Sequence, residues 1–262
     1  MTEKRRNMEY EKTFTDALQF IWGEGFLSPG GPEEIAAIFH ETNLSGQRVL
    51  DIGSGLGGID LLLVQAYGAG HVTGIDVEPE LIAEATALAA RQGLADRCAF
   101  QAVTPGALPF SDARFDVVFS KDAMVHVADK PALYSEIRRV LAPGGVLRAG
   151  DWLWSPGAAD HPAVKAWVGG GPLHFIFTTP DEAQAALIAA GLQDVRVVDR
   201  RAALQASNRD LIGRLHGPDF RQLVDLVGEA NALSRREAAH LRQAALDEGQ
   251  LIPCHLFART PF

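Results

Sequence analysis

The chain has 262 residues, of which 47% are hydrophobic and 22% charged, and its formal net charge is −9 at pH 7. This length and composition favour the core of one large domain over two independent catalytic domains. The acidic balance argues against a nucleic-acid partner, because nucleic-acid binding rests on Lys and Arg side chains that neutralise phosphates.

Membrane and metal-binding signals are weak in this sequence. The basic residues Lys4, Arg5 and Arg6 are not followed by an apolar stretch, and no apolar run is long enough to cross a bilayer. We therefore expect a cytoplasmic protein without a membrane partner. Cys98 and Cys254 lie far apart and have no His or Cys at metal-ligand spacing, so we expect neither a disulfide nor a metal site.

The first 45 residues predict two helices joined by a turn. A helix is expected over about residues 9–22, a Gly/Pro-rich turn over 23–31, and a second helix from Pro32 onwards. We interpret residues 1–45 as a helical lid.

Residues 46–151 alternate short apolar runs with helical patterns. Strands are predicted at 48–52, 71–76, 98–103, 115–120 and 145–150, and helices at 57–67, 79–92 and 130–141. Such alternation is typical of βαβ units around a parallel sheet. Pro143-Gly144-Gly145 is expected to stop the last helix and make the turn into the strand that follows.

The pattern loosens after Asp151 and then recovers. A helix is predicted at 180–190, a strand at 195–198, two amphipathic helices within 208–247 with Ser234 as the N-cap of the second, and a strand at 251–257. We expect residues 152–262 to form the substrate side of the same domain, so that one α/β domain spans 1–262. Its architecture would be a three-layer sandwich around a mostly parallel seven-stranded sheet, with late helices covering the site.

A glycine-rich loop follows the first predicted strand. Gly53, Gly55 and Gly58, with Asp76 at the end of the next strand, satisfy the spacing of a dinucleotide-binding loop, so an NAD(P)-dependent oxidoreductase is one alternative. Asp51 favours a different cofactor, because its carboxylate would repel a pyrophosphate but suit the ammonium group of a zwitterionic cofactor. The carboxylate of such a cofactor could bind the amides at the start of the helix.

These residues also resemble a known family. Asp51-x-Gly53-x-Gly55-x-Gly57, Asp76 and Leu141-x-Pro143-Gly144-Gly145 resemble, in that order, motif I, the ribose-binding acid and the turn before the fifth strand of class I methyltransferases. The resemblance implies a Rossmann-like fold and S-adenosylmethionine as the cofactor.

Two further stretches, residues 20–31 and 120–126, resemble phosphoethanolamine N-methyltransferases, and the second also resembles sarcosine and dimethylglycine N-methyltransferases. The likeness extends from about Tyr10 to Gly150. It implies that Tyr10 and His126 form a catalytic pair that contacts the substrate. It also implies a cofactor site made of Leu27, Ser28, Asp51, Gly53, Gly55, Asp76, Val77 and Lys121, with Thr104 at the position where the family has an adenine-binding Asp.

The substrate side departs from the phosphoethanolamine enzymes. Their phosphate-binding Tyr, Arg and Lys cluster should follow the fifth strand, where this chain has Trp152, Trp154 and glycines. We therefore expect a small amine acceptor, with His126 as general base because histidine ordinarily titrates near neutral pH. Asp122, four residues earlier, could orient the His126 ring and contact the substrate, and Trp152 could face the methylammonium. The alternatives are methylation at carbon or oxygen, and a binding protein without turnover.

Overall fold

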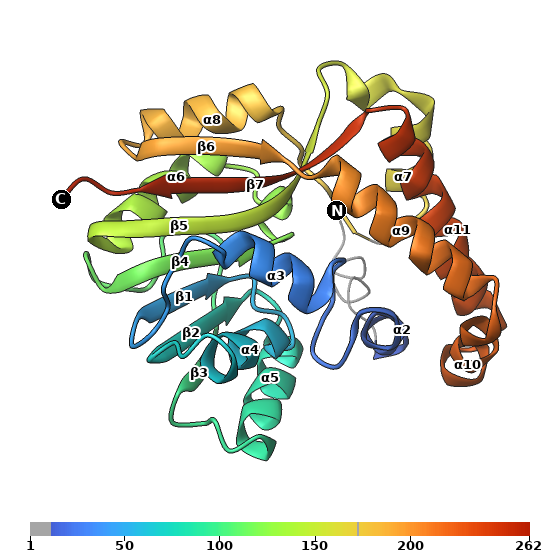
Figure 1. The fold of residues 1–262 in the computed structure, drawn as a ribbon, viewed down its shortest axis with the longest axis horizontal. Coiled ribbons are helices and arrows are strands. Elements are labelled where there is room, and N and C mark those ends of the chain that lie inside the picture. The colour runs from blue at the N-terminus through green and yellow to red at the C-terminus, as the bar shows by residue number, and fades with distance from the viewer. Residues whose placement is uncertain (1–11, 172) are drawn as a thin grey trace.

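The computed structural model describes residues 12–171 and 173–262, which fold around one seven-stranded sheet of order β3-β2-β1-β4-β5-β7-β6 (Figure 1). The strands are β1 (Arg48–Ile52), β2 (His71–Asp76), β3 (Cys98–Ala102), β4 (Phe115–Lys121), β5 (Leu141–Trp154), β6 (Gln193–Asp199) and β7 (Leu251–Arg259). β1 to β5 pair in parallel, and β7 runs antiparallel to both β5 and β6. The expected α/β fold with a mostly parallel sheet is confirmed.

Helices cover both faces of the sheet and give three layers (Figure 1). α3 (Gly31–Phe39), α4 (Gly58–Gln65) and α5 (Pro79–Arg91) pack on one face, and α6 (Lys130–Val140) and α8 (Pro180–Ala189) on the other. Successive strand residues point to opposite faces, so Val117 and Phe119 join the first helix layer whereas Val118 joins the second. This alternation buries β4 on both faces, as a central parallel strand requires.

A second group of helices gathers at one end of the sheet (Figure 1). It contains α2 (Lys12–Trp22), α7 (Pro162–Gly169), α9 (Arg201–Leu215), α10 (Pro218–Val227) and α11 (Glu229–Asp247). α2 packs on α10 and α11 through an apolar cluster that includes Ala17, Ile21, Leu215 and Leu223. Two short 3-10 turns, Met124–His126 and Ala158–Asp160, complete the described elements.

The segment 201–247 differs from the sequence prediction. It holds three helices rather than two, and Ser234 lies inside α11 instead of capping it. The boundaries lie at Gly217-Pro218 and at Gly228, whose φ is 83°. Pro218 starts α10 as its first residue, and Gly228 adopts a left-handed φ between helices, as glycine can.

Pro143-Gly144-Gly145 is not a turn ahead of β5 but part of that strand. α6 ends at Val140 as expected, yet Leu141 already pairs with Phe115, and the register shifts before Val146 pairs with Val117. The C-terminal tail supplies the reason, since the amide of Gly144 donates to the Pro261 carbonyl and that of Thr260 to the Gly145 carbonyl. Pairing with a distant segment thus turns a local break into a bulge within the strand.

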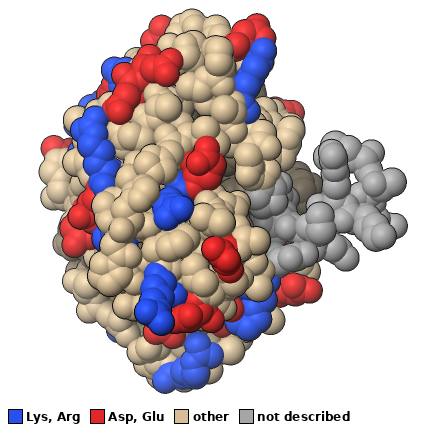
Figure 2. Space-filling view, turned by 90° about the vertical axis from the view of Figure 1, so that its right-hand side faces the viewer, with Lys and Arg blue, Asp and Glu red and all other residues tan. Residues whose placement is uncertain are grey.

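Charges on the face shown in Figure 2 are mixed, with Lys and Arg lying among Asp and Glu rather than in one basic band. Within residues 12–171 and 173–262, no helix is long and apolar enough to cross a membrane. The same residues contain no group of three His, Cys, Asp or Glu side chains arranged to hold a metal ion.

Candidate functional site

The glycine loop connects the end of β1 to the start of α4. Gly53 has φ of 82°, and a Cβ atom on it would lie 2.1 Å from Cβ of Ala123, in the loop after β4. Only glycine allows these two loops to touch. The amide of Gly55 donates to Oδ2 of Asp76, 3.0 Å away, which ties the loop to the end of β2.

The carboxyl group of Asp76 joins the glycine loop to the chain that follows β2. Its other oxygen, Oδ1, accepts from the amide of Glu78 at 3.0 Å, and burial raises the pKa of its carboxyl group. The amide of Val103 donates to the Asp76 carbonyl, so the exposed Thr104 lies in the loop next to it. Val77, the residue after Asp76, leaves 51% of its surface exposed.

Two buried carboxyl groups, Asp51 on β1 and Asp60 on α4, lie at the base of the loop, with 1% and 0% of their surface exposed. Among the described residues, neither oxygen of Asp60 nor Oδ1 of Asp51 has a hydrogen-bond partner. Burial, and then repulsion from Asp60, raise the pKa of Asp51 well above its usual range, and burial raises the pKa of Asp60 to about 8. Asp51 lies beside the glycine loop and is buried next to a second acid, Asp60, that the motif did not indicate.

The turn between α2 and α3 sits on the glycine loop. The amide of Gly58 donates to the Gly25 carbonyl at 3.2 Å, and a Cβ on Gly58 would lie 2.7 Å from that carbonyl group. A Cβ on Gly55 would lie 3.1 Å from Leu27. Leu27 therefore lies over the glycine loop.

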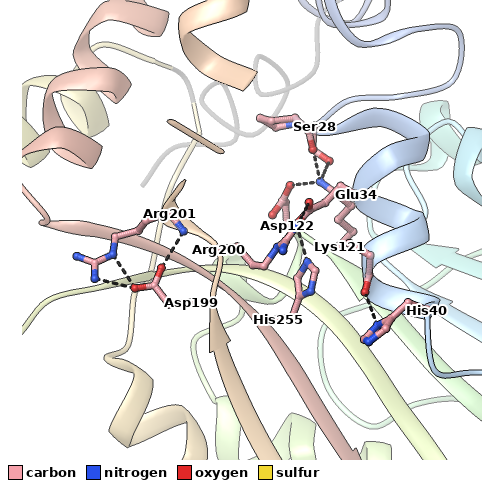
Figure 3. A network of polar contacts seen from close by, with 11 residues as sticks. Ser28, Glu34, His40, Lys121, Asp122, Asp199, Arg200, Arg201 and His255 are labelled. Carbon is pink, nitrogen blue, oxygen red and sulfur yellow. Dashed lines mark hydrogen bonds and ion pairs between the residues drawn. The ribbon is translucent and has the colours of Figure 1, made fainter. Parts of the chain in front are cut away.

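Lys121, the last residue of β4, joins this turn to the sheet (Figure 3). Its Nζ donates to Oγ of Ser28 at 2.9 Å, to the Pro29 carbonyl at 2.6 Å and to Oδ2 of Asp122 at 2.6 Å. Among the described residues, Asp122 thus pairs with Lys121 rather than with His126. The reason is local: Asp122 has a left-handed φ of 55°, which turns the chain between the two residues.

A second polar group, which the sequence analysis missed, links α3 to β7 and the start of α9. Glu34 accepts from Nη2 of Arg200 at 2.9 Å and lies 2.5 Å from Nε2 of His255 (Figure 3). Burial acts to raise the pKa of Glu34, but the hydrogen bonds from His255 and Arg200 hold it down at about 2. These residues are 166 and 221 positions from Glu34 in the chain, so no local pattern could connect them.

A small cavity of about 40 Å³ lies between these two groups. Lys121, Asp122 and Trp152 line it, together with Glu34 and Arg200. The cavity therefore brings together three of the residues expected around the cofactor or the substrate. His126 is not among its lining residues.

His126 ends the short turn that follows Ala123. Its Nδ1 lies 2.5 Å from the carbonyl oxygen of His174, and its ring stacks on Phe175 with centroids 5.2 Å apart. Because a carbonyl oxygen only accepts hydrogen bonds, Nδ1 carries a hydrogen, and Nε2 is the ring nitrogen that could take a proton.

Aromatic rings connect His126 to the cavity. Phe175 stacks on Trp167 at 5.0 Å between centroids, and Trp167 contacts Trp152 at 5.4 Å. Trp152 is 5% exposed, so most of its surface serves packing. The other member of the expected catalytic pair, Tyr10, lies outside the described residues.

Comparisons with known proteins find methyltransferases similar to this chain. Residues 43–160 match the family model described as a methyltransferase domain. A phosphoethanolamine N-methyltransferase of Triticum aestivum is 31% identical over 74% of this chain and 37% of its own length, and one of Zea mays is 34% identical over 58% and 30%. A sterol 24-C-methyltransferase of Gibberella zeae is 34% identical over 55% and 41%. The chain spans only about a third of the length of the plant relatives it matches.

Solved structures of low sequence identity share the fold. A phosphoethanolamine N-methyltransferase 2 of Haemonchus contortus, in complex with phosphomonomethylethanolamine and S-adenosylhomocysteine, superposes with a TM-score of 0.90 at 21% identity over 99% of this chain and 60% of that one. A structure from Galdieria sulphuraria, described as a candidate sarcosine dimethylglycine methyltransferase, superposes with a TM-score of 0.80. Its identity is 18%, and the match covers 96% of this chain and 99% of that one. Residues 43–160 therefore match a methyltransferase domain in sequence, and the described chain has the Rossmann-like fold of methyltransferases of known structure.

Proposed function

We propose that this protein is an S-adenosylmethionine-dependent methyltransferase that methylates the nitrogen of a small amine. The observation that carries the proposal is the contact between Gly53 and Ala123. This contact places the glycine loop directly against the turn that ends in His126. A cofactor bound at the loop would then lie close to the imidazole that is to accept the proton. We further propose that the enzyme works in the cytoplasm and takes no nucleic acid as a partner.

The described residues fit the proposed cofactor. Oδ1 of Asp51 and Oγ of Ser54 are buried without hydrogen-bond partners, so a polar ligand with an ammonium group would complete them. Asp51, Gly53 and Gly55 would hold the aminoacyl end, and Asp76 with Val77 and Thr104 the ribose and adenine. Leu27, Ser28 and Lys121 would close the site from above. The helices within residues 1–45 and 152–262 would then act as the lid and the substrate side of the single domain.

When bound, S-adenosylmethionine supplies a methyl group already activated on a sulfonium. The chain then has to align the acceptor, exclude water and remove one proton. Nε2 of His126 would take the proton of the acceptor ammonium, which frees the nitrogen lone pair for attack. The face of Trp152 would stabilise the methylammonium that forms, and Tyr10 and Asp122 would complete the contacts with the acceptor.

The proposal is tested by calorimetric binding of S-adenosylhomocysteine and of NAD to the wild-type protein and to Asp76→Ala. We expect micromolar binding of S-adenosylhomocysteine, weakened at least tenfold in the variant, since Asp76 ties the loop and faces the ribose. An acceptor screen with ethanolamine, phosphoethanolamine, sarcosine and dimethylglycine follows. Binding of NAD in place of S-adenosylhomocysteine would show an oxidoreductase instead.

Gly58 offers a steric test of the lid. Gly58→Ala would push the Gly25 carbonyl away from the glycine loop, because the new Cβ has no space. We expect S-adenosylhomocysteine affinity to fall about tenfold, in line with an overpacking cost of roughly 1–3 kcal/mol. Gly213→Ala is the matched control, since that glycine lies within α9 with no atom within 4 Å of an added Cβ. An equal loss of affinity in both variants would contradict a specific role of the Gly25 contact.

Methylation at carbon is a second candidate. The aromatic rings of Trp152, Trp167 and Phe175 form an apolar wall that suits a hydrocarbon acceptor, and relatives include a sterol C-methyltransferase. Methyl transfer to an olefin in the acceptor screen, with no transfer to amines, would favour this candidate. NMR of the methylated product distinguishes the two reactions.

A further inference from the structure

The turn that carries His126 is joined to an extended segment, residues 173–178. The amide of Ile176 donates to the Val125 carbonyl at 2.7 Å, and Nδ1 of His126 lies against the His174 carbonyl. The hydrogen bond of the Ile176 amide therefore fixes the segment two residues after His174, whose carbonyl contacts the imidazole. The segment has no regular secondary structure of its own, so its position depends on these contacts.

A buried lysine secures the same segment. Lys130, the first residue of α6, is 3% exposed, and its Nζ donates to the carbonyls of Val127 and Ile176. A lysine this buried loses its hydration, and burial lowers its pKa. The Lys130 ammonium therefore links the two stretches of chain, because the Val127 carbonyl lies just after His126 and the Ile176 carbonyl lies in the 173–178 segment.

Asp151 lies on the other side of the turn. It is 1% exposed, and its Oδ1 accepts from the amide of Val125 at 3.1 Å, one residue before His126. Its Oδ2 has no hydrogen-bond partner among the described residues. Burial and the charge of Asp122 raise the pKa of Asp151 to about 7, and the opposite charge of Lys130 acts against that rise. The buried side chains of Lys130 and Asp151 thus both contact the backbone around the His126 turn.

We propose that Lys130 and Asp151 are positioning residues of the transfer, which clamp the His126 turn to the 173–178 segment and so hold the hydrogen of His126 on Nδ1. This inference rests on the proposed function, because it explains how Nε2 stays available as the proton acceptor. Lys130 does not line the cavity, and Asp151, which does, would act through the Val125 amide. Without the clamp, the His174 carbonyl would drift, and the imidazole hydrogen would distribute between the two ring nitrogens.

The test is NMR of protein labelled with ¹⁵N in its histidine rings, with the His126 signal assigned by its loss in His126→Gln. We expect the wild-type protein to show hydrogen on Nδ1, and Lys130→Met to show a mixture of both tautomers. In the same variant kcat should fall roughly tenfold, whereas the affinity for S-adenosylhomocysteine should stay within twofold. Lys165→Met is the control, since Lys165 is exposed and forms its ion pair with the exposed Asp160.

The outcomes separate the two proposals. A wild-type protein without methyl transfer would overturn the proposed function, but the tautomer of His126 could still be measured. An unchanged tautomer and kcat in Lys130→Met would overturn the clamp. Should that variant not fold, Asp151→Leu decides, because leucine removes the acceptor of the Val125 amide: a shifted tautomer supports the clamp and an unchanged one overturns it.

Discussion

Replacing His126 with glutamine is expected to lower kcat by about 100-fold or more, the usual contribution of a positioned general base. The physical reason is the hydrogen bond between Nδ1 and the His174 carbonyl, which leaves Nε2 as the ring atom able to take a proton. Glutamine keeps the size and polarity of the side chain but cannot accept that proton at neutral pH. Binding of S-adenosylhomocysteine should stay within about twofold, because the imidazole takes no part in the glycine loop.

Steady-state kinetics across a pH series provide the measurement. The variant should have a lower kcat than the wild-type protein throughout the series, because glutamine offers no atom that takes the proton. His71→Gln serves as the control, since His71 begins β2 at the amino end of the strand, away from the site. A wild-type kcat in His126→Gln would show that another group removes the proton and would leave His126 as a packing residue against Phe175.

Replacing Asp60 with asparagine is expected to stabilise the protein at about pH 8 and to flatten the loss of stability between about pH 5 and pH 8. In the folded chain, burial raises the pKa of Asp60 to about 8 from an ordinary value of 3.8. Between these values the folded state keeps a proton that the unfolded chain has lost, so the free energy of unfolding decreases as pH rises. The slope for one proton approaches about 1.4 kcal/mol per pH unit.

Urea unfolding of both proteins at several pH values gives this difference directly. The wild-type protein should lose stability from about pH 5 upwards, whereas Asp60→Asn carries no ionisable group there and should lose less. Asp210→Asn is the control, since Asp210 is an exposed residue of α9. Parallel curves for wild type and Asp60→Asn would mean that Asp60 is already ionised in the folded state, balanced by a cation that the described residues do not reveal.

The central part of the fold could be derived from the sequence because its signals are local. The strand, glycine turn and helix over residues 48–65 follow from apolar runs and from glycines that permit left-handed φ values. Asp76 lies at the end of β2 because a polar residue ends an apolar run, and its contact with Gly55 follows from the parallel register of β1 and β2. Leu27 and Ser28 were indicated by likeness to a family, and no periodicity of the chain would have singled them out.

Tertiary structure alone decided the partners of the charged residues. Asp122 lies four positions before His126, which suggests a helical contact, yet it pairs with Lys121 because the chain turns between them. Lys121 reaches Ser28 across 93 positions, and Asp60 becomes a buried acid only because α4 packs it beside Asp51. Secondary structure depends on short-range backbone geometry and can be inferred from neighbouring residues. Burial and charge pairing depend on which distant segments share a surface, and so they arise only when the sheet and its covering helices come together.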